Sequence, residues 1–366
     1  MEEDLIYWIA VNNVLSEYLE PTRKIIDHFS PIKKVLSAEK KDLLSLGLDK
    51  KTVGVLLSSK SLDQAKKEID WLKKKGYTPL SFRDQRYPAL LRETFNPPLV
   101  LYCAGRVEAL EKPSVSLVGA RKPTPYGRAV AENLASQLAS KGLVIVSGMA
   151  RGVDSIAHWG ALKGGRTIAV LGSGLNKIYP PENRRLFNKI TETGVVVTEY
   201  SKDSPPLGRH FPMRNRIISG LSLASVVLEA TQKSGSLITA QLALDQNREV
   251  MAVPGNITSK LSQGTNWLIQ NGAKAITSWE DVVEEFPEPY KEQFSQKKHK
   301  MKEIGPSLSP REKVIYDLLK TDSITHIDEL VTASSLSVPE ALSVLLKLEL
   351  EDMIHQSPGK FYQRKL

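Results

Sequence analysis

The fold of this chain is decided by residues 114–148, SVSLVGARKPTPYGRAVAENLASQLASKGLVIVSG. The stretch opens with one apolar run, Ser114–Val118, and closes with another, Leu143–Val146. Both runs are continuous rather than alternating, which is typical of strands buried on both faces of a sheet. Between them, apolar side chains recur on one helical face over Tyr126–Lys141, and Gly142 is placed to end that helix. The stretch therefore predicts two parallel strands joined by a helix.

The same alternation of apolar runs and helical stretches continues to about residue 275. Further continuous runs lie at Thr167–Leu171, Val195–Thr198, Ala224–Leu228, Glu249–Val253 and, more briefly, near Ala275. Repeated strand–helix–strand units predict an α/β fold, with a Rossmann-like doubly wound parallel sheet and right-handed crossovers. We expect this extended Rossmann-like domain to cover residues 78–286.

The residues before this domain predict a separate helical domain over 1–77. Its expected helices are Asp4–Leu15, Thr22–Phe29, Ala38–Leu46, Lys51–Ser58 and Leu62–Lys75. Leu46-Gly47-Leu48 is similar to a helix-hairpin-helix turn, but it contains a single glycine. We therefore favour a helical packing or protein-contact module over a phosphate-binding one.

The residues after the sheet predict a linker and a winged-helix domain. Residues 287–308 hold three prolines and a basic stretch, which is typical of a linker. In 309–366, helices are expected to begin near Ser309, His326 and Ser337. Met353–Gln356 and Lys360–Gln363 then predict a two-stranded wing.

The composition is that of a globular protein, with 41% hydrophobic and 25% charged residues. No run of eighteen apolar residues occurs and the N-terminus is acidic, so we expect a cytoplasmic protein without membrane insertion. Cys103 is the single cysteine, and the six histidines show no metal-ligand spacing. We therefore expect neither a metal nor a cofactor.

The net charge of +9 is concentrated in one segment. Residues 112–220 contain 16 Lys and Arg against 6 Asp and Glu, whereas residues 286–366 contain 12 of each kind. A localised excess of this kind favours a polyanionic partner, because each neutralised phosphate releases counterions and adds affinity.

The loops that follow the predicted strands carry the candidate binding residues, since ligands of parallel sheets lie beyond the carboxyl ends of the strands. These loops are rich in glycine, serine and arginine, the residue types that bring backbone N–H groups and guanidinium forks to phosphates. The predicted phosphate-backbone contacts in these loops are Gly119, Arg121, Lys122, Ser147, Gly148, Arg151, Ser173, Gly174, Arg184, Arg185, Ser234, Gly235 and Ser236.

The segment Arg209–Arg216 interleaves aromatic rings with guanidinium groups, a combination that stacks bases and binds the backbone of single-stranded nucleic acid. From it we predict nucleic-acid contacts by Arg209, Phe211, Arg214, Asn215 and Arg216. A surface helix start with Phe211 in the core is the alternative, but three basic glycine loops at the same sheet edge favour binding.

Catalytic and nucleotide-binding constellations are missing from the same loops. G-x-G-x-x-G is absent, as is an acidic residue suited to a ribose at the end of the second strand. Glu199, Asp203 and Glu229 are the carboxylates expected near this edge, and each lacks the paired partner that acid–base chemistry requires. We assign Asp154 to a helix N-cap and His158 to a structural role.

Taken in order, these loops resemble the DNA-processing protein A (DprA/Smf) family over about residues 78–285. The resemblance rests on GAR (119–121), SGMARGVDSIAH (147–158), FPMRNRIISGLS (211–222), SGSLITA (234–240) and AVPG (252–255). It implies a non-catalytic homodimer that binds and protects incoming single-stranded DNA and loads RecA recombinase in natural transformation. The resemblance further implies that the dimer interface includes Asn266, Trp267 and Leu268. It also implies that helix Leu237–Asp245 contacts RecA and that single-strand-binding protein is a further partner.

Two alternatives come from other classes. A nucleotide-hydrolysing enzyme of the lysine-decarboxylase-like phosphoribohydrolase type would share the sheet, but its P-G-G-x-G-T signature is absent and Pro254-Gly255-Asn256 does not replace it. A regulator specific for double strands would read DNA with the third helix of the winged domain, Val338–Asp352. That helix carries four acidic residues and one lysine, which favours a protein contact instead.

Overall fold

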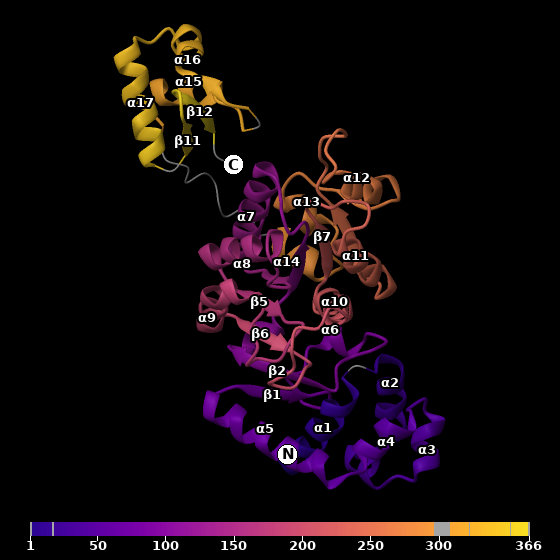
Figure 1. Ribbon diagram of the computed structural model, residues 1–366. Coiled ribbons are helices and arrows are strands. Elements are labelled where there is room, and N and C mark those ends of the chain that lie inside the picture. The colour runs from indigo at the N-terminus through magenta and orange to yellow at the C-terminus, as the bar shows by residue number, and fades with distance from the viewer. Residues whose placement is uncertain (1, 17, 296–307, 322, 352, 365–366) are drawn as a thin grey trace. The chain divides into compact units, whose positions relative to one another are not determined.

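The computed structural model describes residues 2–16, 18–295, 308–321, 323–351 and 353–364 (Figure 1). Two compact units are present, Met1–Phe294 and Ser295–Leu366. The first contains the N-terminal helices and a nine-stranded sheet, and the second contains a three-stranded sheet with three helices. The predicted domain boundaries within and between these units stay predictions.

The large sheet has the strand order β1-β2-β6-β5-β4-β3-β7-β8-β9. From β6 to β9 every neighbouring pair is parallel. The strands are β1 (Thr78–Ser81), β2 (Val100–Gly105), β3 (Ser114–Val118), β4 (Val144–Ser147), β5 (Thr167–Val170), β6 (Val195–Thr198), β7 (Ala224–Val227), β8 (Glu249–Ala252) and β9 (Lys274–Ala275). The predicted doubly wound sheet is confirmed, and its strand order reverses between β3 and β7, where such folds form their ligand crevice.

Side chains of the central strands alternate between two hydrophobic clusters. Val115 and Leu117 belong to one cluster, whereas Val118 belongs to the other. Helices α7 (Pro125–Ser140), α8 (Val153–Gly164) and α13 (Trp279–Glu284) contribute to the first cluster, and α9 (Arg184–Thr193), α10 (His210–Gly220) and α11 (Gly235–Asp245) contribute to the second. The strands are therefore buried on both faces, as their continuous apolar sequence predicts.

Two edge strands were not predicted. β2 pairs antiparallel with β6, and β1 pairs antiparallel with β2. Short apolar runs do not by themselves distinguish a strand from a buried helix turn, and the helix between β1 and β2 is only four residues long, too short to show an amphipathic pattern. Their place in the sheet comes from the N-terminal helices, which cover this edge (Figure 1).

The N-terminal helices pack on the sheet edge and share a hydrophobic core with it. Asn12 Nδ2 donates to the Glu199 carbonyl at 2.8 Å, and the Lys202 backbone N–H donates to Glu68 at 2.6 Å. The elements are α1 (Glu2–Leu15), α2 (Leu19–His28), η1 (Ile32–Ser37), α3 (Lys40–Ser45), α4 (Lys50–Leu56) and α5 (Ser59–Lys75).

The second unit is a winged helix, as predicted. Its helices are α15 (Pro310–Leu318), α16 (Ile327–Ser334) and α17 (Val338–Leu350), and its strands are β10 (Thr325–His326), β11 (Ile354–Ser357) and β12 (Phe361–Arg364). The remaining elements of the first unit are α6 (Ala89–Arg92), η2 (Val107–Glu111), η3 (Pro181–Asn183), α12 (Gln263–Gln270) and α14 (Tyr290–Ser295).

Candidate nucleic-acid interface

The switch point between β3 and β7 is held together by Glu229. Its carboxylate accepts hydrogen bonds from the Thr124 backbone N–H at 2.9 Å and from Thr124 Oγ1 at 2.5 Å. Thr124 in turn is the N-cap of α7 and accepts from the Gly127 N–H. Glu229 is buried, and its carboxylate joins the loop after β7 to the loop after β3.

The loop after β3 presents exposed cations beside that junction. Arg121 and Lys122 are both exposed, and each precedes the start of α7. A Cβ at Gly119 would lie 2.8 Å from the Val153 side chain. Because glycine has no Cβ, the backbone can pass this close to α8. The structure therefore turns the two predicted cationic side chains of this loop toward solvent.

The loop after β4 is held from beneath by Asp154. Asp154 Oδ2 accepts from the backbone N–H groups of Gly148 at 3.1 Å and Ala150 at 3.4 Å. The N-cap position of α8 is occupied by Gly152, so the prediction that Asp154 caps this helix is wrong. The short loop folds back over the first turn, which brings its N–H groups to the buried carboxylate instead.

The histidine of α8 is structural, as expected. His158 is fully buried, and its Nδ1 lies 2.6 Å from Thr167 Oγ1. Burial, with a contribution from the nearby Arg214 charge, lowers the pKa of His158 to about 3, so the imidazole is neutral at physiological pH.

Arg214 lies inside the protein rather than on the DNA-facing surface that we expected. Its side chain is 4% exposed, and Nη1 donates to the Gly148 carbonyl at 2.7 Å and to the Val170 carbonyl. Burial lowers the pKa of Arg214 to about 10, which leaves the guanidinium charged at neutral pH. Arg214 therefore ties the ends of β4 and β5 to α10.

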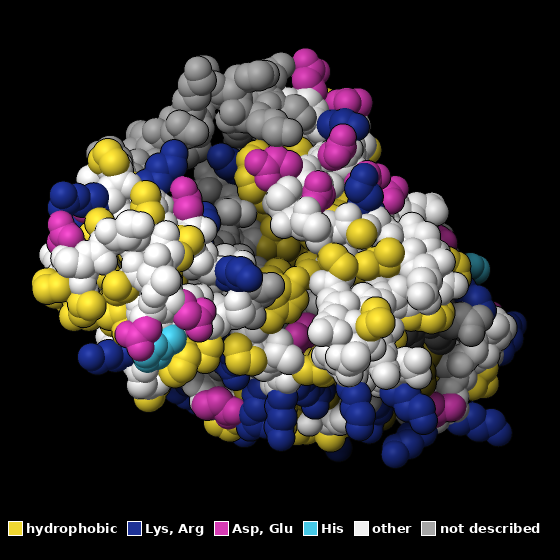
Figure 2. Space-filling view, turned by 90° about the horizontal axis from the view of Figure 1, so that it is seen from above, with side chains coloured by type: hydrophobic (Ala, Val, Ile, Leu, Met, Phe, Trp, Pro, Cys, Tyr) yellow, Lys and Arg dark blue, Asp and Glu magenta, His cyan; other side chains and the backbone are white. Residues whose placement is uncertain are grey.

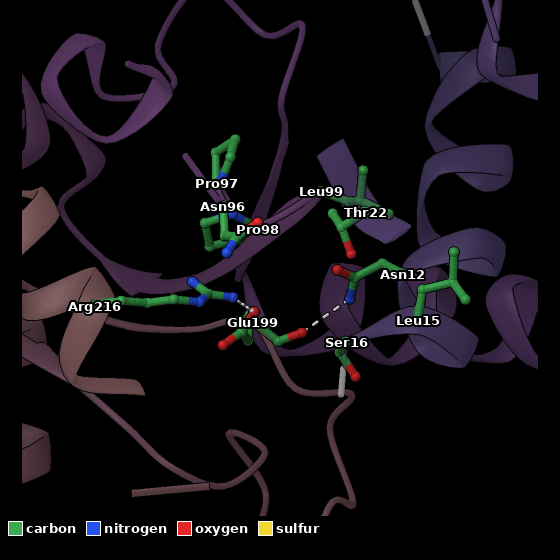
Figure 3. A pocket seen from close by; sticks show the side chains of 10 residues that line it. All are labelled: Asn12, Leu15, Ser16, Thr22, Asn96, Pro97, Pro98, Leu99, Glu199 and Arg216. Atoms are coloured by element: carbon green, nitrogen blue, oxygen red, sulfur yellow. Dashed lines mark hydrogen bonds and ion pairs between the residues drawn. The ribbon is translucent and has the colours of Figure 1, made fainter. Parts of the chain in front are cut away.

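Arg216 is also buried, and it pairs with Glu199. Both line a pocket in Figure 3, together with Asn12, Leu15, Ser16, Thr22 and Asn96–Leu99. Arg216 Nε and Nη1 have no protein partner among the described residues, a situation that ordered water normally relieves. The pocket lies toward the N-terminal helices, and Arg216 is engaged there by Glu199, the first residue after β6, rather than exposed at the surface.

Phe211 and Tyr179 form an aromatic pair beside the loop after β5. Their ring centroids are 5.6 Å apart, and a Cβ at Gly172 would lie 3.0 Å from the Phe211 ring. Tyr179 is exposed and Phe211 is half-buried. Tyr179 was not among the predicted contacts, although its position in a strand-end loop, next to a proline, was visible in the sequence. We call these two rings the aromatic platform.

The small residues of the same loops serve the protein's own backbone. Ser147 Oγ donates to the Leu117 carbonyl and Ser173 Oγ to the Lys177 carbonyl, each at 2.7 Å. Gly148 and Gly174 are buried, and a Cβ at Gly174 would lie 2.1 Å from the Ser201 carbonyl oxygen. These residues shape the loops rather than expose hydroxyl groups.

The remaining predicted contacts lie at or near the surface. Arg209 precedes α10 and is exposed, as are Arg184 and Arg185 at the start of α9. Arg151 is exposed and forms an ion pair with Glu182 at 2.5 Å. Figure 2 shows Lys and Arg side chains gathered along one margin of the molecule, the lower edge of that view.

The start of α11 contains the last predicted loop. Ser234 is its N-cap and accepts from the Ser236 N–H at 3.3 Å, while Gly235 is exposed. Asn215 Nδ2 donates to the Gly235 carbonyl at 3.4 Å, so this predicted contact joins α10 to the loop.

Of the predicted interface residues, Trp267 is the exposed one, at 49%. Leu268 is buried in the core, and Asn266 holds the chain at Gly255 through hydrogen bonds of 3.0 and 3.2 Å. Trp267 on α12 is thus the side chain of this group that is free to meet a second copy.

A metal site and a membrane-spanning helix each place requirements on the side chains of the described ranges. There, no group of three or more His, Cys, Asp and Glu side chains is disposed to hold a metal ion. No single described helix is long and apolar enough to cross a membrane, although the bent pair α16 and α17 reaches that limit together by length and composition.

The sequence matches two protein-family models and several known relatives. The DNA recombination-mediator protein A family matches residues 78–287, and the DprA winged helix domain matches residues 300–360. Protein Smf of Synechocystis is 32% identical over 98% of both chains. The DNA processing protein DprA of Bacillus subtilis is 43% identical over 59% of this chain and 73% of its own.

Two solved structures of DprA proteins have a fold similar to that of this chain. DprA from Streptococcus pneumoniae superposes with a TM-score of 0.65 at 35% identity, covering 76% of this chain and 96% of its own. DprA from Helicobacter pylori, described with a single-stranded DNA binding mode, gives 0.53 at 34% identity over 58% and 97%.

The fold and strand-end loops define a Rossmann-like protein with a winged helix, of the class of DNA recombination mediators. Within that class, the chain belongs to the DNA recombination-mediator protein A (DprA/Smf) family.

Proposed function

We propose that this chain binds single-stranded DNA across the carboxyl ends of β3, β4, β5 and β7, protects it, and loads RecA recombinase onto it in the cytoplasm. The observation that supports the DNA site is the aromatic platform, which lies in the same set of strand-end loops as the exposed Arg121, Lys122 and Arg209. Cations that bind phosphates beside rings that stack bases are the usual means of holding a single strand.

In this proposal the predicted residues divide into two groups. The exposed cations and the platform contact DNA, with Arg151, Arg184 and Arg185 extending the track. Arg214, Asn215, Ser147, Ser173, Gly148 and Gly174 hold the loops in place through protein contacts. The loading of RecA and the part played by single-strand-binding protein rest on the family resemblance, with α11 as the proposed RecA contact.

Salt dependence tests the DNA site. Affinity for a thymidine oligonucleotide is measured by fluorescence anisotropy over a range of salt concentrations. Arg121→Ala and Arg209→Ala should each reduce the slope of log K against log salt by about 0.7 to 1, because each loses one phosphate contact. Phe211→Ala should leave the slope nearly unchanged and lower affinity by about 1–3 kcal/mol.

Duplex DNA and a truncated chain are the controls. A duplex should bind more weakly than the single strand, because paired bases cannot stack on the platform. Deletion of residues 300–366 should retain most single-strand binding. If the deletion abolishes binding while Arg121→Ala and Phe211→Ala are silent in folded protein, the winged helix is the DNA-binding element and the proposal is wrong.

We further propose a homodimer in which Trp267 is buried at the subunit contact. Trp267→Ala should convert the dimer to a monomer, as measured by light scattering at micromolar concentration. A wild-type protein that is already monomeric there contradicts this proposal.

The geometry of Glu229 disfavours a hydrolytic function, because both oxygens of its carboxylate accept hydrogen bonds from Thr124. We expect no turnover of nucleoside monophosphates. Hydrolysis that disappears in Glu229→Gln would overturn the binding function in favour of a phosphoribohydrolase-like enzyme.

A further inference from the structure

A second aromatic side chain with a cation beside it lies on the outer side of α8. Trp159 is 36% exposed, and the Arg185 guanidinium carbon lies 5.9 Å from its ring centroid. Arg185 belongs to α9, which packs against α8 (Figure 1). Tryptophan is rarely left on a surface without a reason of packing or binding, and it has the best ring for cations and bases.

This pair lies a short distance along the chain from the aromatic platform. Tyr179 and Arg185 are six residues apart, with η3 between them and Arg185 in the first turn of α9, so at most about 20 Å divides their backbones. Between them, Glu182 carries the exposed ion pair with Arg151. A DNA strand that leaves the platform along this stretch would pass Arg151 and Arg184 before it reaches Trp159.

The position of the arginines is not explained by helix stability. Arg184 and Arg185 are the first two residues of α9, and its first turn contains no acidic side chain. Cations at a helix N-terminus oppose the helix dipole, whereas an anion there is stabilised. Two arginines at this end are therefore better suited to an external phosphate backbone than to the helix itself.

We propose that Trp159 and Arg185 form a second base-stacking subsite for single-stranded DNA, several nucleotides from the aromatic platform. This inference rests on the proposed function. A base held between the indole and the guanidinium requires about 7 Å, which is twice the stacking distance of about 3.4 Å. The present 5.9 Å opens to that value with a shift of about 1 Å in an exposed arginine side chain.

Oligonucleotide length separates the two sites. Trp159→Leu should weaken binding of a thymidine 20-mer by about 5- to 100-fold, the effect of losing one base stack, and should leave a strand of about 4 nucleotides unaffected. Phe211→Ala should weaken both lengths. Phe95→Ala, which removes an aromatic ring that is 74% exposed on another loop, is the matched control and should change neither.

Arg185 variants separate stacking from charge. Arg185→Ala should weaken the 20-mer and lower its salt slope by about 0.7 to 1, whereas Arg185→Lys should weaken it with the slope retained, because lysine keeps the charge without the planar stacking surface. Trp159→Phe, which preserves apolar packing, should abolish most of the tryptophan quenching that the 20-mer causes in the wild type.

The outcomes distinguish this inference from the function on which it rests. If Phe211→Ala weakens binding while Trp159→Leu and Arg185→Ala bind the 20-mer like the wild type, the second subsite is wrong and the first stands. If Phe211→Ala is also silent, the proposed function fails. If Trp159→Leu is unstable, the affinity of Arg185→Ala for the 20-mer and the loss of quenching in Trp159→Phe decide.

Discussion

Replacement of Arg214 by methionine tests whether this residue supports the loops or contacts DNA. In the structure the guanidinium donates to the carbonyls of Gly148 and Val170 and lies near the buried Asp154 carboxylate. A Cβ at Gly148 would lie 2.5 Å from Arg214 Nη2 and 2.7 Å from Asp154 Oδ2, so the two side chains enclose this glycine. Methionine keeps most of the unbranched apolar stem and removes the guanidinium group with its charge.

The expected loss of unfolding free energy is about 3–5 kcal/mol. Removing one member of a buried charged pair costs this much, because the remaining carboxylate stays buried without its cation. The lost hydrogen bonds to two carbonyls would each be worth about 1.5–3 kcal/mol, but they are part of the same total rather than additional to it. An exposed cation such as Arg121 should change stability by no more than about 0.5 kcal/mol when replaced by alanine.

Tryptophan fluorescence during urea unfolding is a suitable assay, because all five tryptophans lie in the first unit. Its transition is therefore recorded separately from that of the winged helix. Adding Asp154→Asn to Arg214→Met should recover part of the lost stability, since the uncompensated charge is then removed. Under conditions where the variant is folded, its salt slope for single-stranded DNA should match the wild type.

The opposite pattern would refute this reasoning. If Arg214→Met unfolds within about 0.5 kcal/mol of the wild type and lowers the salt slope by about one unit, Arg214 contacts a phosphate. The prediction made from the sequence would then hold, and the loop-supporting role would be wrong.

Two further predictions concern the same loops. Because burial lowers the pKa of His158 to about 3 from an unfolded value near 6.5, the unfolded chain binds the extra proton between these values. The free energy of unfolding should therefore fall as the pH is lowered through this window. Between pH 7 and pH 5, His158→Gln should lose about 2 kcal/mol less of it than the wild type, as measured by urea unfolding. Equal losses in the two proteins would contradict the buried neutral imidazole. Gly152→Ala should destabilise the protein by about 1–3 kcal/mol and weaken DNA binding, since Gly152 has φ +78° and a Cβ would lie 2.3 Å from the Ala120 carbonyl oxygen. Gly54→Ala is the control, because a Cβ at this position of α4 meets open space, and it should raise the melting temperature slightly. If Gly152→Ala changes neither stability nor DNA binding, the loop can shift to accommodate a Cβ and this prediction is wrong.

Much of the fold follows from local sequence alone. Continuous apolar runs and amphipathic stretches depend on which residues are neighbours along the chain, and they predict the strands β3 to β8 and the helix α7. The carboxyl ends of those strands must meet at one edge, so the sequence is sufficient to assign the loops of Arg121, Phe211 and Ser234 to one region. β1 and β2 were missed because their pairing depends on the distant β6 and on the N-terminal helices.

The exposure of each arginine, by contrast, was decided by the tertiary structure. Arg209 and Arg214 lie in one short segment, yet one is exposed and the other is covered by carbonyls 66 and 44 residues away in sequence. Tyr179 becomes part of a platform because α10 carries Phe211 to it, and Asp154 leaves the cap position because its loop folds over the helix. Residue type and spacing predict which groups can bind a phosphate, but burial and partners depend on segments that only folding brings together.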